Sequence, residues 1–184
     1  MMSGAVWFRT DLRLDDNPAL NAALNKNDEV LAIYIFSKTQ WDLHNESNIK
    51  HNFLINNLTL LEESLAKLSI PLIAINTESY KTLPKALSSF SAEQKIDHVF
   101  WNKEFGLNEA DRDLASIEAL KKINIESSSF NDQVIYEPGF LKTGQGKPFS
   151  VFTPFKRRWI ENFDMNFLDI AKPLKLKKPF PIQS

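Results

Sequence analysis

The first apolar segment of the chain, residues 5–8, leads directly into a charged turn that contains no glycine. From Arg9 to Pro18 this turn carries two arginines and three aspartates. A dinucleotide-binding domain has G-x-G-x-x-G at the same place, because its backbone must approach a pyrophosphate closely. The charged side chains exclude that approach, and the five glycines of the chain form no Walker A loop either. We expect Arg–Asp pairs to hold this turn in one shape instead.

The composition favours one domain without metal or thiol chemistry. The chain has 184 residues, of which 43% are hydrophobic, enough for one well-buried core. It has no cysteine, and its three histidines, His44, His51 and His98, lack the spacing of metal ligands. No basic N-terminal region precedes a long apolar stretch, and no apolar run approaches the length of a membrane span. We therefore expect a cytoplasmic protein with no metal and no contact with a membrane.

Charge is divided unevenly along the chain. Residues 1–141 hold 13 Lys and Arg against 20 Asp and Glu, a net charge of −7, whereas residues 142–184 hold 9 against 3, a net charge of +6. An acidic body repels a phosphate backbone, so we expect only weak, salt-sensitive and sequence-independent binding to nucleic acid. The basic C-terminal part fits either a solvated tail or a binding patch.

Short apolar segments alternate with helical patterns as far as residue 130. Asn17 and Pro18 are typical of a helix start, as N-cap and first helical residue. A long helix begins near Ile49, and we expect the apolar stripe from Ile49 to Leu68 to face the core. Strands are predicted at 5–8, 29–37, 71–75, 97–101 and 125–130, and helices at 18–25, 49–68, 81–90 and 110–122.

This alternation predicts an α/β fold, a Rossmann-like five-stranded parallel sheet with helices on both faces. The simplest strand order is 3-2-1-4-5. Ligands of such a sheet bind beyond the carboxyl ends of the strands, near the switch between the first and fourth strands. Three polar loops, 9–16, 40–45 and 102–109, would converge there.

The pattern changes after residue 135, and this change suggests three segments. Residues 1–135 would form the α/β core, and residues 136–170 a loop and a short helix that complete the domain. Residues 171–184, which are rich in lysine and proline, are typical of the start of an interdomain linker.

The segment from Trp7 to Leu20 resembles the N-terminal signature of the DNA photolyase and cryptochrome family. Two later stretches agree in order and spacing, namely Asn102–Glu109 with Arg112-Asp113, and Thr143-Gly144 with Val151–Lys156 and Trp159. Gln40-Trp41 and His44-Asn45 are similar to the folate-type photolyases that act on cyclobutane pyrimidine dimers.

The resemblance implies an architecture larger than this chain. In that family a helical domain follows the α/β domain and binds FAD and the flipped dimer of UV-damaged DNA, and we expect it beyond Ser184. The 184-residue chain alone is therefore expected to be inactive, and its partner would be the helical FAD-binding domain. The four tryptophans, Trp7, Trp41, Trp101 and Trp159, are expected to serve packing rather than electron transfer.

The same resemblance implies an antenna cofactor, 5,10-methenyltetrahydrofolate, held weakly by this fragment. Asn108 and Glu109 match the family's pterin-binding pair, and His44 matches a histidine that contacts the folate. A glutamate accepts two N–H bonds from a pterin, and an asparagine amide donates to its ring carbonyl. The alternative from the residues alone is that Asn108 is a helix N-cap and Glu109 a first-turn acid.

Two other functions stay open at this point. The domain could belong to a cryptochrome-type blue-light sensor that repairs nothing, or it could be a stand-alone module that binds a pigment or nucleotide. A helical FAD domain with a lesion pocket after Ser184 would favour the light-harvesting domain of a repair enzyme.

Overall fold

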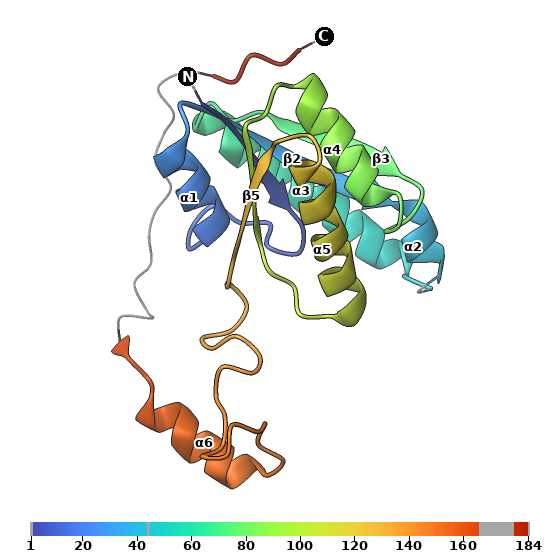
Figure 1. The fold of residues 1–184 in the computed structure, drawn as a ribbon. Coiled ribbons are helices and arrows are strands. Elements are labelled where there is room, and N and C mark those ends of the chain that lie inside the picture. The colour runs from blue at the N-terminus through green and yellow to red at the C-terminus, as the bar shows by residue number, and fades with distance from the viewer. Residues whose placement is uncertain (1, 44, 166–178, 184) are drawn as a thin grey trace.

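The computed structural model describes residues 2–43, 45–165 and 179–183. A five-stranded parallel sheet forms its centre, in the order β3-β2-β1-β4-β5 (Figure 1). This order confirms the predicted fold and topology. The strands are β1 (Ser3–Phe8), β2 (Glu29–Ser37), β3 (Leu72–Thr77), β4 (His98–Asn102) and β5 (Glu126–Phe130).

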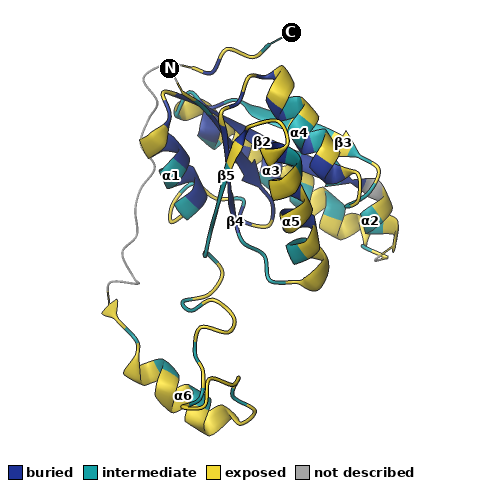
Figure 2. Ribbon diagram, in the orientation of Figure 1, coloured by how far each residue is buried: buried dark blue, intermediate teal, exposed yellow. Residues whose placement is uncertain are grey.

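Helices cover both faces of the sheet. The helices are α1 (Pro18–Lys26), α2 (Lys38–Leu43), α3 (Asn48–Lys67), α4 (Leu83–Glu93), α5 (Leu107–Lys121) and α6 (Phe152–Glu161). Side chains that alternate along β1 enter different cores, because successive residues of a strand point to opposite faces. Val6 and Phe8 pack with α1 and α3, whereas Ala5 and Trp7 pack with α4 and α5. The central strands are therefore buried on both faces, which explains their continuous apolar runs (Figure 2).

The start of α1 follows the sequence prediction. Asn17 is the N-cap, its side chain accepts a hydrogen bond from the Leu20 amide at 3.1 Å, and Pro18 occupies the first turn. Asn102, at the end of β4, donates to the Asn17 side chain at 2.8 Å and accepts from the Ala19 amide at 3.0 Å. Two side chains from different elements thus satisfy amides that a helix start leaves without intrahelical partners.

Two local predictions were wrong. Residues 38–43 form the short helix α2 where a loop was expected around Gln40. In α3, only the second half faces the sheet: Leu61 and Leu65 are buried, whereas Ile49 and Phe53 are 81% and 69% exposed. The first half of α3 extends beyond the strand ends, where it borders a cavity instead of the core.

The C-terminal segment 179–183 lies against the body of the domain. Phe180 is 6% exposed and joins the core formed by α4, α5 and the strands. Gln94 and Gln183 exchange two hydrogen bonds, of 3.1 and 2.8 Å, that fix this segment beside α4. Residues 171–178 of the predicted linker lie outside the described residues, but 179–183 are anchored rather than extended into solvent.

None of the described helices is long and apolar enough to cross a membrane.

The anchor gives the first prediction. Phe180→Ala leaves a cavity in the core and is expected to lower the free energy of unfolding by about 3 kcal/mol. Ile182→Ala is the matched control, because Ile182 is 52% exposed; it should change stability by no more than ~0.5 kcal/mol. Urea unfolding of both variants measures the difference. Equal stability of the two variants would show that the segment does not contribute to the core.

Candidate functional site

A cavity of about 610 Å³ opens at the carboxyl ends of β1 and β2. It is bounded by residues of all three loops that were expected to converge: Arg9–Arg13, then Gln40 and Trp41, then Glu104 and Glu109. This volume lies within the usual range of small-molecule sites. The three loops that were expected to converge therefore border one cavity, which lies on the β2 side of the β1/β4 switch.

Aromatic side chains form one wall of this cavity. Trp41 of α2 packs edge-to-face on Phe36, with ring centroids 5.7 Å apart, and stacks on His51 of α3 at 4.1 Å. Tyr34 and Phe53 also line the wall. At its rim, Glu46 and Lys50 form an ion pair. Flat, fixed aromatic surfaces beside charged groups suit a planar ligand that carries polar edges.

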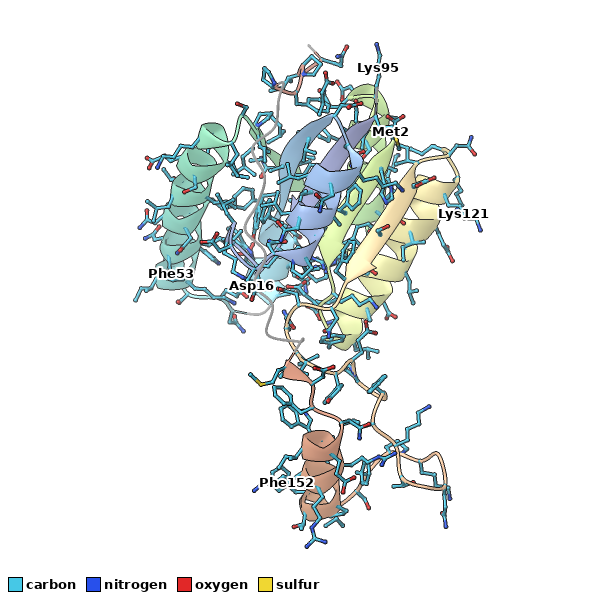
Figure 3. The ribbon with its side chains drawn as sticks, turned by 90° about the vertical axis from the view of Figure 1, so that its left-hand side faces the viewer. Met2, Asp16, Phe53, Lys95, Lys121 and Phe152 are labelled. Atoms are coloured by element: carbon cyan, nitrogen blue, oxygen red, sulfur yellow. The ribbon has the colours of Figure 1, made fainter. Side chains whose placement is uncertain are left out.

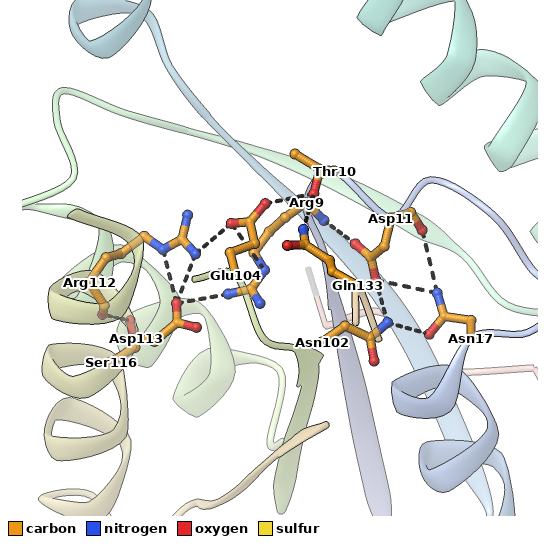
Figure 4. A network of polar contacts seen from close by, with 10 residues as sticks. All are labelled: Arg9, Thr10, Asp11, Asn17, Asn102, Glu104, Arg112, Asp113, Ser116 and Gln133. Atoms are coloured by element: carbon orange, nitrogen blue, oxygen red, sulfur yellow. Dashed lines mark hydrogen bonds and ion pairs between the residues drawn. The ribbon is translucent and has the colours of Figure 1, made fainter. Parts of the chain in front are cut away.

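A buried network of ion pairs lies on the side of the cavity opposite the aromatic wall (Figure 4). Arg9 donates to Asp113 at 2.8 Å, and Arg112 donates to Asp113 and to Glu104, each at 2.8 Å. The side chains of Arg9 and Arg112 are only 5% and 4% exposed. Both guanidinium groups lie over the Trp7 ring, at 4.7 and 4.9 Å from its centroid. The network joins the end of β1 to the first half of α5.

Electrostatics favour the ionised form of Glu104 in this network. Burial by itself disfavours the charged form of Glu104, but Arg9 and Arg112 outweigh it and hold the pKa of Glu104 below its ordinary value. Burial also opposes the Arg112 cation, yet Asp113 and Glu104 raise the pKa of Arg112. For Arg9 burial prevails over Asp113, and its pKa is lowered. The charges are thus compensated by one another rather than by water.

The charged turn after β1 is fixed by partners that are distant in sequence. Arg13 pairs with Asp132, as Arg9 pairs with Asp113. Asp11 accepts bonds from the Arg9 amide at 2.8 Å and from Asn102 at 2.6 Å. The expected Arg–Asp pairs therefore exist, but they connect the turn to α5 and to the segment after β5 instead of closing within the turn.

The structure places only one of the three predicted ligand residues at the cavity. Glu109 lines the cavity and lies in the first turn of α5, as expected. Asn108 does not line the described cavity, and it is not the N-cap, because α5 begins one residue earlier with Gly106 as its cap. His44 lies outside the described residues.

The Glu109 side chain lies close to the glycine at this cap. The Glu109 carboxylate folds back over Gly106, so that a Cβ at Gly106 would lie 2.0 Å from Glu109 Oε2. Any side chain at position 106 would displace that carboxylate.

Several cavity residues were missed from the sequence. Tyr34 and Tyr80 come from β2 and from the segment after β3, and neither belongs to a motif. The sequence identified Arg112 only as part of a family motif. Its guanidinium lies 5.2 Å from the Tyr80 ring centroid at the cavity. The adjacent opposite charges of Arg112 and Asp113 inside a predicted helix were the sequence signal that could have located it.

A family model described as DNA photolyase matches residues 5–179 of the chain. The chain is 36% identical over 171 residues to a deoxyribodipyrimidine photo-lyase of Vibrio cholerae, an alignment that covers 93% of this chain and 36% of that protein. It therefore spans about a third of the length of this relative.

Two solved structures have the same fold. A class III photolyase from Agrobacterium tumefaciens superimposes with a TM-score of 0.74 and 29% identity, over 100% of this chain and 37% of that one. A cryptochrome from Synechocystis sp. PCC6803 gives a TM-score of 0.75 at 19% identity, over 100% of this chain and 38% of that one. At 19% identity the second likeness shows the fold alone.

The buried network gives the second prediction. Glu104→Gln removes one of the two carboxylates that compensate Arg9 and Arg112, and it is expected to lower the free energy of unfolding at pH 7 by about 3 kcal/mol. Because the folded-state pKa of Glu104 is depressed, its stabilisation is present above its ordinary pKa of 4.5 and is lost as the pH falls further. The difference between wild type and variant should therefore shrink below that pH.

Urea unfolding at pH 7 and at pH 3 measures this difference, with the exposed Glu62→Gln as control. An unchanged gap between wild type and Glu104→Gln at both pH values would contradict a role for the ionised carboxylate.

Proposed function

Because the chain belongs to the DNA photolyase family, we propose that it is the light-harvesting domain of a deoxyribodipyrimidine photo-lyase and holds 5,10-methenyltetrahydrofolate as its antenna. Members of this family bind FAD and a second, antenna chromophore, and they act on UV-damaged DNA. Bound folate would absorb blue light and pass its excitation to FAD in a helical domain of the parent enzyme, where the cyclobutane dimer is split.

The observation that carries this proposal is the position of Glu109 at a cavity with aromatic walls. A pterin presents an amino group and a ring N–H on one edge, and a carboxylate accepts both. Asn108 stands next to Glu109 in the same helical turn, where its amide could donate to the ring carbonyl of a ligand held at the cavity mouth. His44, which matches a histidine of the family that contacts the folate, would be a further contact.

The curated relative favours repair over signalling. The Vibrio cholerae protein, at 36% identity, is a photo-lyase, whereas the likeness to a cryptochrome extends to the fold only. We therefore place the domain in a repair enzyme, with residues 1–135 as the α/β core, 136–170 as the segment that completes it and 171–184 as the start of the connection to the helical domain. In the cell this enzyme would be cytoplasmic.

The third prediction tests the folate contact. Glu109→Gln replaces one acceptor by a donor that faces a donor, and the loss of a charge-assisted bond, about 1.5–3 kcal/mol, weakens folate binding roughly 10- to 150-fold. Glu118→Gln is the matched control, because it makes the same charge change on α5 away from the cavity. Fluorescence titration with methenyltetrahydrofolate measures both.

Asn108→Asp separates a ligand contact from a helix-start effect. An aspartate near the N-terminus of α5 should leave thermal stability unchanged or slightly raised, so a loss of folate affinity without a loss of stability identifies a ligand contact. Unchanged affinity in both Glu109→Gln and Asn108→Asp would refute the proposed site. If the cavity bound a flavin instead of the folate, the proposed identity of the chromophore would be wrong, but the proposed antenna role would stand.

The fourth prediction concerns the photochemistry. The 184-residue chain should not split a thymine dimer in an oligonucleotide under blue light, and it should carry no FAD through gel filtration, because the flavin site is expected in the helical domain. The full parent enzyme is the positive control. Repair by the chain itself would overturn the division of roles proposed above.

A further inference from the structure

The carboxylate of Glu109 rests on the backbone at the start of α5. In Figure 3, Phe53 lies at the cavity end of the sheet and Met2 at the opposite end. The helix α5 begins at the cavity end, with Gly106 as its N-cap. Glu109 is the third residue of α5, the position from which a capping-box glutamate folds back toward the cap. Its Oε2 takes the place that a Cβ of residue 106 would fill, and its Cδ lies 2.9 Å from that place.

The space beside Gly106 is filled by Glu109. The three atoms nearest to the place of a Cβ at Gly106 all belong to the Glu109 side chain. The backbone of Gly106 is extended, with φ −67° and ψ 150°, a conformation that any residue adopts. The missing side chain therefore provides room for a carboxylate rather than an unusual backbone conformation. We call the place of the carboxylate against Gly106 the resting position.

No other side chain holds the carboxylate in the resting position. Within residues 2–43, 45–165 and 179–183, the Glu109 carboxylate has neither an ion-pair partner nor a side chain that donates a hydrogen bond to it. Glu104, by contrast, is bound by Arg112 at 2.8 Å and by Thr10 at 2.7 Å. The Glu109 side chain is thus able to exchange between the resting position and outward rotamers over the cavity that it lines.

The resting position competes with the ligand contact of the proposed function. A pterin edge offers two N–H donors, and both carboxylate oxygens must be accessible to accept them. In the resting position Oε2 lies against the cap, so that only the other oxygen is available. The ligand must therefore draw the carboxylate outward before both bonds form.

We propose that Gly106 is a positioning residue that lowers the affinity of this site for its ligand, because it gives the Glu109 carboxylate the resting position. The apparent affinity of a site is reduced by the fraction of molecules that are in the binding-competent arrangement. The inference rests on the proposed function, in which Glu109 accepts the N–H groups of the pterin. It adds a residue that acts through Glu109 without contacting the ligand.

Gly106→Ala fills the resting position with a methyl group and leaves the carboxylate only its outward rotamers. If these are populated in about 10% of the molecules, folate binding tightens about 10-fold when they become the only state. Fluorescence titration of the whole chain with methenyltetrahydrofolate measures the gain. Damage to the start of α5 would weaken binding, so the sign of the change identifies the mechanism. The melting temperature should shift by no more than about 3 °C, because the extended backbone at residue 106 accepts an alanine.

Gly144→Ala is the matched control, because a Cβ at Gly144 meets no atom within 4 Å. It should leave folate affinity as in the wild type. A second measurement needs no folate: the carboxyl resonance of Glu109 in an isotope-labelled chain, assigned by its absence in Glu109→Gln, should shift in Gly106→Ala and stay in place in Gly144→Ala. Weaker folate binding or an unmoved carboxyl resonance in Gly106→Ala would overturn the inference.

The Glu109→Gln background tests whether the two residues act together. Gly106→Ala should not tighten folate binding in Glu109→Gln, because the carboxylate that the methyl group displaces is gone. Tightening in that background would mean that Gly106 acts without Glu109 and would also overturn the inference.

The same titrations separate this inference from the proposed function. Weaker folate binding in Glu109→Gln together with unchanged binding in Gly106→Ala refutes the role of Gly106 alone. Unchanged folate binding in Glu109→Gln refutes the proposed folate contact, and the role of Gly106 in affinity falls with it.

Discussion

Two buried arginines held between two carboxylates are the interaction on which the ligand-binding end of this domain depends. Arg9 follows directly after β1, and Arg112 and Asp113 lie in α5, so their bonds to one another and to Glu104 set how α5 meets the sheet. Glu109 precedes Arg112 by one helical turn and is placed at the cavity by the same contacts. These directional bonds also fix the rotation of α5 about its axis.

That rotation has a visible consequence along α5. The helix buries Arg112, Asp113 and Ser116, while Leu107 and Leu114 are 79% and 62% exposed. A helix normally turns its apolar stripe inward. Here the compensation of four charges outweighs the burial of two leucines, because an unpaired buried charge costs far more than an exposed apolar side chain.

The sequence predicted those features that depend on local chemistry. The Asn17-Pro18 start of α1, the strand order and the convergence of three loops at one edge all follow from neighbouring residues and from general rules of parallel sheets. The partner of Arg9 could not be predicted in this way, because Asp113 is 104 residues away and nothing in the turn selects it. The predicted N-cap of α5 was also wrong, because the helix begins at Leu107 with Gly106 as its cap instead of Asn108.

The burial of Phe180 gives the end of the chain a part in assembling the core. Its ring belongs to the same buried cluster as residues of α4, which lie nearly a hundred residues earlier in the sequence. During synthesis on a ribosome, the five strands would be complete well before this ring leaves the exit tunnel. Until then the nascent sheet would lack one apolar side chain of its core, and a chain that ended before residue 180 would leave that part of the core open.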